Sequence, residues 1–412
     1  MDDEGHVEQI LTSVRRLTLD YHTGVQVVEF ADGRVAAGIN NSAANSAEAA
    51  GDIQASSYDV SAREITFFST DGAQFVAEIG RNSDPDDRRA RPIIYLDQNH
   101  WITLARRIHN PSKVQSSDMA PSERIIELAR AQKIILPLSA GHLVETTRAH
   151  GGWRRNLAPV MMELSRGWQM LHPVDVRHAE LDVTFTRLSG GLADMPVGND
   201  IFGLTPRMVF GRAATPPPES ELSADLPSAM RDLAGRTSWV ASIYSILLEN
   251  DAIPTPEGDR AAEAWARRYA DLAVELRDNR QARTNARKIT LVKYLLDLRP
   301  EMAEAALRAG ISAERFEEWA FGDAEFDIAA CPSVGLAREA VHHRLMNADD
   351  HWEANDLTDL NFLACATAYA DVVVAERKAT GYLTRAWRAR GTDPPIVRSL
   401  PALVDRLETL VS

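Results

Sequence analysis

Four acidic residues of this chain have the side-chain type and the surroundings expected of metal ligands. Asp97 and Glu376 each end a short apolar run, and Glu145 and Asp359 lie in the first turns of two expected helices. Carboxylates brought together repel one another unless a cation or a proton neutralises them, and Mg²⁺ or Mn²⁺ binds such oxygen ligands well. A metal held there would activate water and stabilise charge on a phosphate, which is the chemistry of phosphodiester hydrolysis.

Short strands and the helices after them must position these acids. In open α/β sheets, ligands bind beyond the carboxyl ends of the parallel strands, and the amino ends of the following helices face the same edge. The expected strands are residues 92–96, 133–138, 170–176, 371–375 and 395–398, and helices over 141–164 and 356–369 carry Glu145 and Asp359. The pattern therefore predicts that the four acids meet at one edge of a central parallel sheet.

The order of these residues resembles that of the PIN domain. The matching features are Leu96-Asp97-Gln98-Asn99, Ser139 with Glu145 six residues later, Asp359 opening an apolar helix, and Glu376 ending a strand. Asp359 and Glu376 are seventeen residues apart, which suits the third and fourth acids of that family. The resemblance covers about residues 92–176 and 350–412, and it implies a three-layered α/β nuclease that cuts single-stranded RNA with Mg²⁺ or Mn²⁺.

The resemblance also implies a role for each matching residue. Asp97, Glu145 and Asp359 would be the core metal ligands. Glu376 would be the fourth acid, which holds a second ion or positions water, although the family more often has Asp at this place. Asn99 would orient Asp97 or the water.

Some of these residues have other interpretations. Asp356 lies three residues before Asp359 on the same helical face, so it could replace that ligand or add to it. Asp97 and Asp359 could instead cap helices, and Glu376 could pair with a neighbouring cation. Glu145 taken alone fits a solvated helix residue.

Basic residues follow the last acid. Arg377, Lys378 and Arg385 are expected to contact RNA phosphates, and Tyr382 could stack on a base. The net charge of −14 argues against non-specific binding of nucleic acid over the whole surface, so binding is expected to be local.

Five ranges describe the expected domain organisation. Asp-Gly pairs at Asp32-Gly33 and Asp71-Gly72, each between apolar runs, predict antiparallel hairpins. The predicted ranges are 1–82 for a small N-terminal antiparallel β domain, 83–91 for a charged linker, 92–189 for the first part of the PIN-like α/β domain, 190–349 for a large helical insertion and 350–412 for the second part of the α/β domain.

The leading hypothesis is a metal-dependent endoribonuclease for single-stranded RNA, with a toxin or defence role by family analogy. No apolar run is as long as a membrane span, and two cysteines in 412 residues predict reduced thiols in a cytoplasmic protein. The alternatives are an inactive PIN-like scaffold that binds RNA or protein, and a metal-dependent phosphohydrolase acting on DNA or nucleotides. A homo-oligomer and an inhibitory partner protein are both left open.

Overall fold

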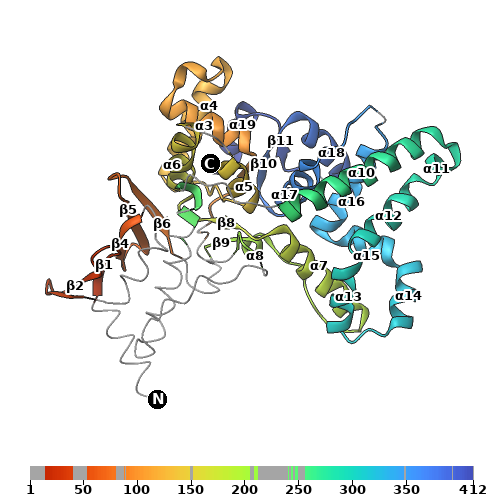
Figure 1. Ribbon diagram of the computed structural model, residues 1–412, viewed down its shortest axis with the longest axis horizontal. Coiled ribbons are helices and arrows are strands. Elements are labelled where there is room, and N and C mark those ends of the chain that lie inside the picture. The colour runs from red at the N-terminus through yellow and green to blue at the C-terminus, as the bar shows by residue number, and fades with distance from the viewer. Residues whose placement is uncertain are drawn as a thin grey trace. The chain divides into compact units, whose positions relative to one another are not determined.

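Contacts divide the chain into two compact units in the computed structural model (Figure 1). Unit 1 combines Met1–Arg91, Trp101–Met170 and Phe202–Ile253, and unit 2 combines Pro92–His100, Leu171–Ile201 and Pro254–Ser412. The structure describes residues 14–39, 53–79, 88, 90–148, 152–204, 208–211, 240, 243–244, 246–248, 256–347, 349–391 and 393–411. Most of the predicted linker 83–91 lies outside these ranges, and the division into five domains stays a prediction.

Unit 1 begins with a six-stranded antiparallel sheet. Both predicted hairpins are present, with Gly33 and Gly72 at φ +86° in the turns, a conformation that favours glycine. Two strands, Val14–Asp20 and Ile53–Asp59, lie outside the predicted hairpins. The sheet order is β3-β2-β1-β4-β5-β6, from β1 (Val14–Asp20), β2 (Val25–Phe30), β3 (Val35–Ile39), β4 (Ile53–Asp59), β5 (Glu64–Ser69) and β6 (Gln74–Glu78).

Helices make up most of the rest of unit 1. The predicted strand over 133–138 is reduced to isolated bridging residues, because Pro137 has no N–H to continue a ladder. The predicted strand over 170–176 is also wrong, since Pro173 starts a helix of unit 2. The elements are α3 (Gln98–His109, in unit 2 through His100), α4 (Ser116–Arg130), α5 (Ala140–Arg148), α6 (Gly152–Ser165), β8 (Gln169–Met170) and β9 (Phe202–Gly203).

Unit 2 contains a small parallel sheet. Its strands are β7 (Ile94–Leu96), β10 (Val372–Val374) and β11 (Ile396–Val397), in the order β11-β10-β7. β10 is the central strand, and all three of its valines are fully buried. β10 and β11 lie side by side in Figure 1. The predicted strands over 92–96, 371–375 and 395–398 are therefore present in shorter form.

The predicted fold class is wrong in its main feature. Parallel strands among the described residues form this three-stranded sheet and not the central sheet of a three-layer α/β domain, and helices dominate unit 2. Its helices are α7 (Pro173–Leu188), α8 (Gly198–Ile201), α10 (Pro256–Asp278), α11 (Arg280–Thr284), α12 (Ala286–Asp297), α13 (Arg299–Arg308), α14 (Ala313–Phe321), α15 (Ala324–Ala330), α16 (Pro332–Leu345), α17 (Asn355–Tyr369), α18 (Arg377–Arg388) and α19 (Leu400–Val411). Helix α16 packs against both α17, which carries Asp356 and Asp359, and α18, which follows Glu376 directly.

Candidate active site

Two of the predicted acids leave adjacent parallel strands at the same edge. Leu96 pairs with Val374, and the N–H of Asp97 donates to the Val374 carbonyl at 2.9 Å. Glu376 follows two residues later and precedes the first residue of α18. The side-chain amide of Asn99 donates to the Glu376 carboxylate, so three predicted site residues meet at this edge.

The electrostatics of this edge link the two strand-end acids to Asp359 on α17. Burial and the neighbouring charge of Glu376 raise the pKa of Asp97, against backbone hydrogen bonds from Gln98 and Glu376. Partial burial, followed by the charges of Asp97, Asp356 and Glu376, raises the pKa of Asp359 to about 7. The Asp359 side chain is still reached by solvent, which screens part of this repulsion.

Asp356 is engaged elsewhere. Its Oδ2 accepts from Nη2 of Arg344 at 2.5 Å and from the backbone N–H of Glu353 at 2.5 Å. These bonds fix the beginning of α17, whereas no side-chain hydrogen bond involves the carboxyl of Asp359 within the described part of unit 2. Of the two acids on α17, Asp359 is therefore the better candidate for a metal ligand.

Glu145 belongs to unit 1. It is solvent-exposed on α5, which begins directly after Ser139. Ser139 is buried, and its N–H donates to Nδ1 of His142 at 3.1 Å, which fixes the start of this helix. The prediction that Glu145 acts with the acids of unit 2 stays a prediction.

The donor set of this edge fits a hard divalent cation in chemistry but not yet in geometry. The oxygens of Asp97, Asp359 and Glu376 are the ligands that Mg²⁺ and Mn²⁺ prefer. Burial and then mutual repulsion raise the pKa values of Asp97 and Asp359, and a cation would relieve the repulsion. Within the described ranges, no group of three or more Asp, Glu, His or Cys side chains stands ready to hold a metal. Binding would have to draw these carboxylates closer together.

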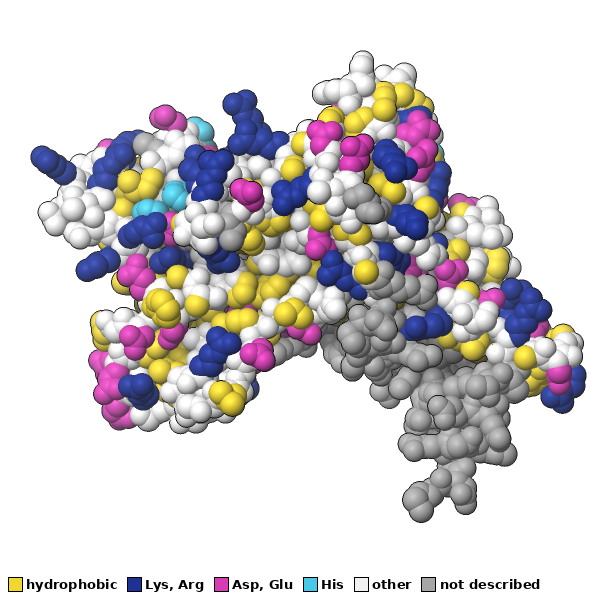
Figure 2. Space-filling view, turned by 180° about the vertical axis from the view of Figure 1, so that it is seen from behind, with side chains coloured by type: hydrophobic (Ala, Val, Ile, Leu, Met, Phe, Trp, Pro, Cys, Tyr) yellow, Lys and Arg dark blue, Asp and Glu magenta, His cyan; other side chains and the backbone are white. Residues whose placement is uncertain are grey.

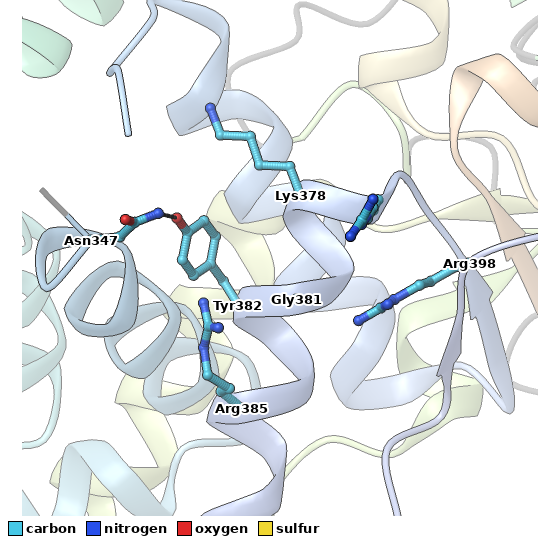
Figure 3. Close-up of a pocket in the computed structure, with 7 residues that line it drawn as sticks. Asn347, Lys378, Gly381, Tyr382, Arg385 and Arg398 are labelled. Carbon is cyan, nitrogen blue, oxygen red and sulfur yellow. Dashed lines mark hydrogen bonds between the residues drawn. The ribbon is translucent and has the colours of Figure 1, made fainter. Parts of the chain in front are cut away.

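The three basic residues predicted to contact RNA lie around one pocket beside Glu376. Arg377, Lys378 and Arg385 all come from α18, and together with Arg398 they line an open hollow of about 460 Å³ (Figure 3). Elsewhere, Lys and Arg side chains are spread among acidic ones over the face in Figure 2. The chain thus has a local basic site despite its negative net charge.

Tyr382 has a different role from the predicted base stacking. Its side chain is buried, and its hydroxyl donates to Asp350 at 2.7 Å and accepts from the Asn347 amide at 2.8 Å. The guanidinium of Arg385 lies over its ring, 4.8 Å from the centroid. Tyr382 therefore supports the pocket wall and holds Arg385 in place.

Arg398 is the basic pocket residue that was not predicted from the sequence. It follows β11 directly, as Asp97 follows β7, so it leaves the sheet at the same edge. Its position at the end of the last expected strand could have predicted this location, because the carboxyl ends of parallel strands lie at the same edge of a sheet. Along this edge the order is Arg398, then Glu376, then Asp97.

Comparisons with known proteins do not indicate a function for this chain. None of the protein-family models, curated proteins or solved structures compared with the chain matches it. The likeness to PIN domains therefore rests on the order of the residues alone. Every helix in the described ranges is too short or too polar to cross a bilayer.

Proposed function

We propose that this protein is a metal-dependent endoribonuclease that hydrolyses single-stranded RNA in the cytoplasm. The observation that carries the proposal is that Asp97 and Glu376 follow adjacent parallel strands and that both of their charges raise the pKa of Asp359. Residues distant in sequence thus form one acidic edge in the order that resembles PIN nucleases. A role as a toxin or defence effector, held by an inhibitory protein, is an extension by analogy.

Each residue of the edge has a proposed role. Asp97, Asp359 and Glu376 would hold Mg²⁺ or Mn²⁺, which when bound supplies positive charge for the phosphate and lowers the pKa of water. Asn99 keeps the Glu376 carboxylate oriented through its amide. Water adds to phosphorus while the bond to the 3′-oxygen breaks, which leaves a 3′-hydroxyl and a 5′-phosphate.

Replacing Asp97 tests this proposal. We expect the full-length protein to cleave labelled single-stranded RNA with Mn²⁺ or Mg²⁺, and Asp97→Asn to lower the rate by at least about 100-fold, as for loss of one key polar group. Asp393→Asn, a change of the same kind at an exposed residue of unit 2, should cleave like the wild type.

The other outcomes separate the remaining functions. RNA binding without cleavage by the wild type, with either metal, would replace the proposal by an RNA-binding scaffold. Cleavage of DNA or of nucleotides but not of RNA would indicate a different phosphohydrolase. RNA cleavage that Asp97→Asn leaves unchanged would refute the assignment of this edge.

A further inference from the structure

The pocket that Arg377, Lys378, Arg385 and Arg398 line is a second site of unit 2, beside the acidic edge. We propose that it binds a phosphate monoester, such as the 5′-phosphate end of an RNA strand. The inference rests on the proposed function for the source of the ligand, because that reaction produces 5′-phosphate ends. The binding of phosphate itself does not depend on cleavage.

The charges of the pocket residues are unbalanced. Lys378 pairs with Asp350, with Nζ 2.7 Å from Oδ1, and this carboxylate also faces Arg344. No carboxylate within 4.0 Å pairs with the other three cations of the pocket in the described part of the chain: Arg377, Arg385 and Arg398. Like charges gathered around one hollow repel unless an anion enters, so the pocket favours a ligand with high negative charge.

The chemical type of the cations also suits a phosphate. Three of the four are arginines, whose planar guanidinium matches phosphate oxygens through paired hydrogen bonds. In Figure 3 the guanidinium of Arg398 points from the end of β11 toward α18, and that of Arg385 extends beside Tyr382. Cations from two elements thus approach the hollow from different sides, as enclosing a tetrahedral group requires.

The floor of the pocket leaves space for a ligand. Gly381 lies four residues after Arg377 and four before Arg385, so it is on the same face of α18. A Cβ atom at Gly381 would meet nothing within 4 Å. The missing side chain leaves room between the two arginines. The guanidinium of Arg385 lies over the ring of Tyr382, so this face of the ring is not free to stack on a base.

Charge also decides between two kinds of phosphate. An internal phosphodiester carries one negative charge, whereas a monoester carries about 1.5 to 2 at neutral pH. A pocket with three unpaired cations gains more from the monoester. Arg398 and Glu376 leave adjacent strands, so a bound end would lie close to the acidic edge.

Binding measurements on the full-length Asp97→Asn protein in EDTA test this inference without cleavage. The probes are inorganic phosphate and one short RNA with either a 5′-phosphate or a 5′-hydroxyl. We expect the 5′-phosphate RNA to bind at least about tenfold more tightly, in keeping with charge-assisted hydrogen bonds. Inorganic phosphate should compete with the 5′-phosphate RNA and reduce this difference in affinity. If phosphate competes and a free nucleotide binds as tightly as the RNA end, the ligand of the pocket is the free compound.

Variants of the pocket complete the test. Arg398→Gln should abolish the preference for the 5′-phosphate, and Arg388→Gln, an exposed residue of α18 outside the pocket, should keep it. Gly381→Leu should abolish the preference without removing a charge, and the open space at that position lets the variant fold. Equal binding of both RNA ends, or a preference unchanged in Arg398→Gln and Gly381→Leu, would overturn the inference. If the wild-type protein does not cleave RNA but the preference for the 5′-phosphate is present, only the proposed function is overturned.

Discussion

At the residue scale, Asp359 is a group whose charge state depends on burial and on the charges of its neighbours. Its carboxyl experiences the charges of Asp97, Asp356 and Glu376, with partial relief from Arg344. The folded protein therefore favours the protonated form more than the unfolded chain does. This difference couples folding, metal binding and pH.

Stability without metal should fall as pH rises. Because the pKa of Asp359 increases on folding from 3.8 to about 7, its contribution is fully present below the lower value and is lost as pH rises through the upper one. We expect Asp359→Asn to show a smaller decrease in melting temperature between pH 5 and 8, measured in EDTA. Parallel curves for the two proteins would contradict the coupling.

Mn²⁺ should stabilise the wild type more at pH 8 than at pH 5, because protons compete for the same carboxylates. The measurement is the shift of melting temperature on adding Mn²⁺ at each pH. Asp359→Asn should lose most of this shift, whereas Asp393→Asn should retain it. A shift that is the same at both pH values would place the bound ion elsewhere.

Asn99 should matter for activity more than for stability. Its side chain is exposed, and its amide contacts the Glu376 carboxylate. We expect Asn99→Ala to reduce RNA cleavage by about 10- to 100-fold, the usual effect of losing a residue that orients a ligand. The melting temperature should change little, and an unchanged cleavage rate would remove Asn99 from the site.

At the element scale, Arg344 connects α16 to the segment before α17. It is buried, its Nε lies 3.1 Å from Oδ2 of Asp350, and its Nη2 donates to the His351 carbonyl at 2.6 Å as well as to Asp356. The guanidinium also lies over Trp352, 4.2 Å from the ring centroid. Through Asp356 it supports the helix of Asp359, and through Asp350 it supports the wall of the basic pocket.

Removing Arg344 should therefore destabilise unit 2 strongly. Arg344→Ala leaves Asp356 without its buried cation and Asp350 with Lys378 alone, and breaking a buried ion pair typically costs about 3–5 kcal/mol. Arg344→Lys should recover only part of this loss, because one ammonium cannot replace the planar fork. Denaturant unfolding measures both, and Arg388→Ala, at an exposed position, should lie within about 0.5 kcal/mol of the wild type.

The sequence predicted the positions of several elements but not how they assemble. Apolar runs ending at Asp97 and Glu376 are strands, and an apolar helix does begin near Asp359, because these signals are local. Pro137 shows where the pattern misled, since a hydrophobic run suits a buried segment with or without a ladder. The pairing of Asp356 with Arg344 depends on tertiary packing, so the choice between two acids on one helix could not be made beforehand.

At the scale of the whole molecule, negative net charge and a basic pocket make opposite contributions to RNA binding. The charge of −14 repels a polyanion at long range, and salt screens this repulsion. Local contacts between cations and phosphates weaken as salt increases, because the release of counterions into a more concentrated salt solution gains less free energy. The salt dependence of binding therefore reports which contribution dominates.

Binding of 5′-phosphate RNA to Asp97→Asn should weaken with salt. Neutralising one terminal phosphate, with its charge of about 2, predicts a slope of log K against log salt of about −1.4, and loss of one of these charge contacts changes the slope by about 0.7. Arg385→Gln should show that reduction, and Arg388→Gln should not. A slope near zero or of opposite sign would show that the pocket does not bind the strand through its charges.

The sheet of unit 2 joins distant parts of the chain, and this sets when the acidic edge can form. Glu376 follows Asn99 by 277 residues, yet the two side chains are hydrogen-bonded. At a synthesis rate of about 5–20 residues per second, the ribosome needs roughly 15–55 s between them. During that interval Asp97 has no partner strand at β10, so an enzyme that degrades RNA would stay inert close to the messenger that encodes it.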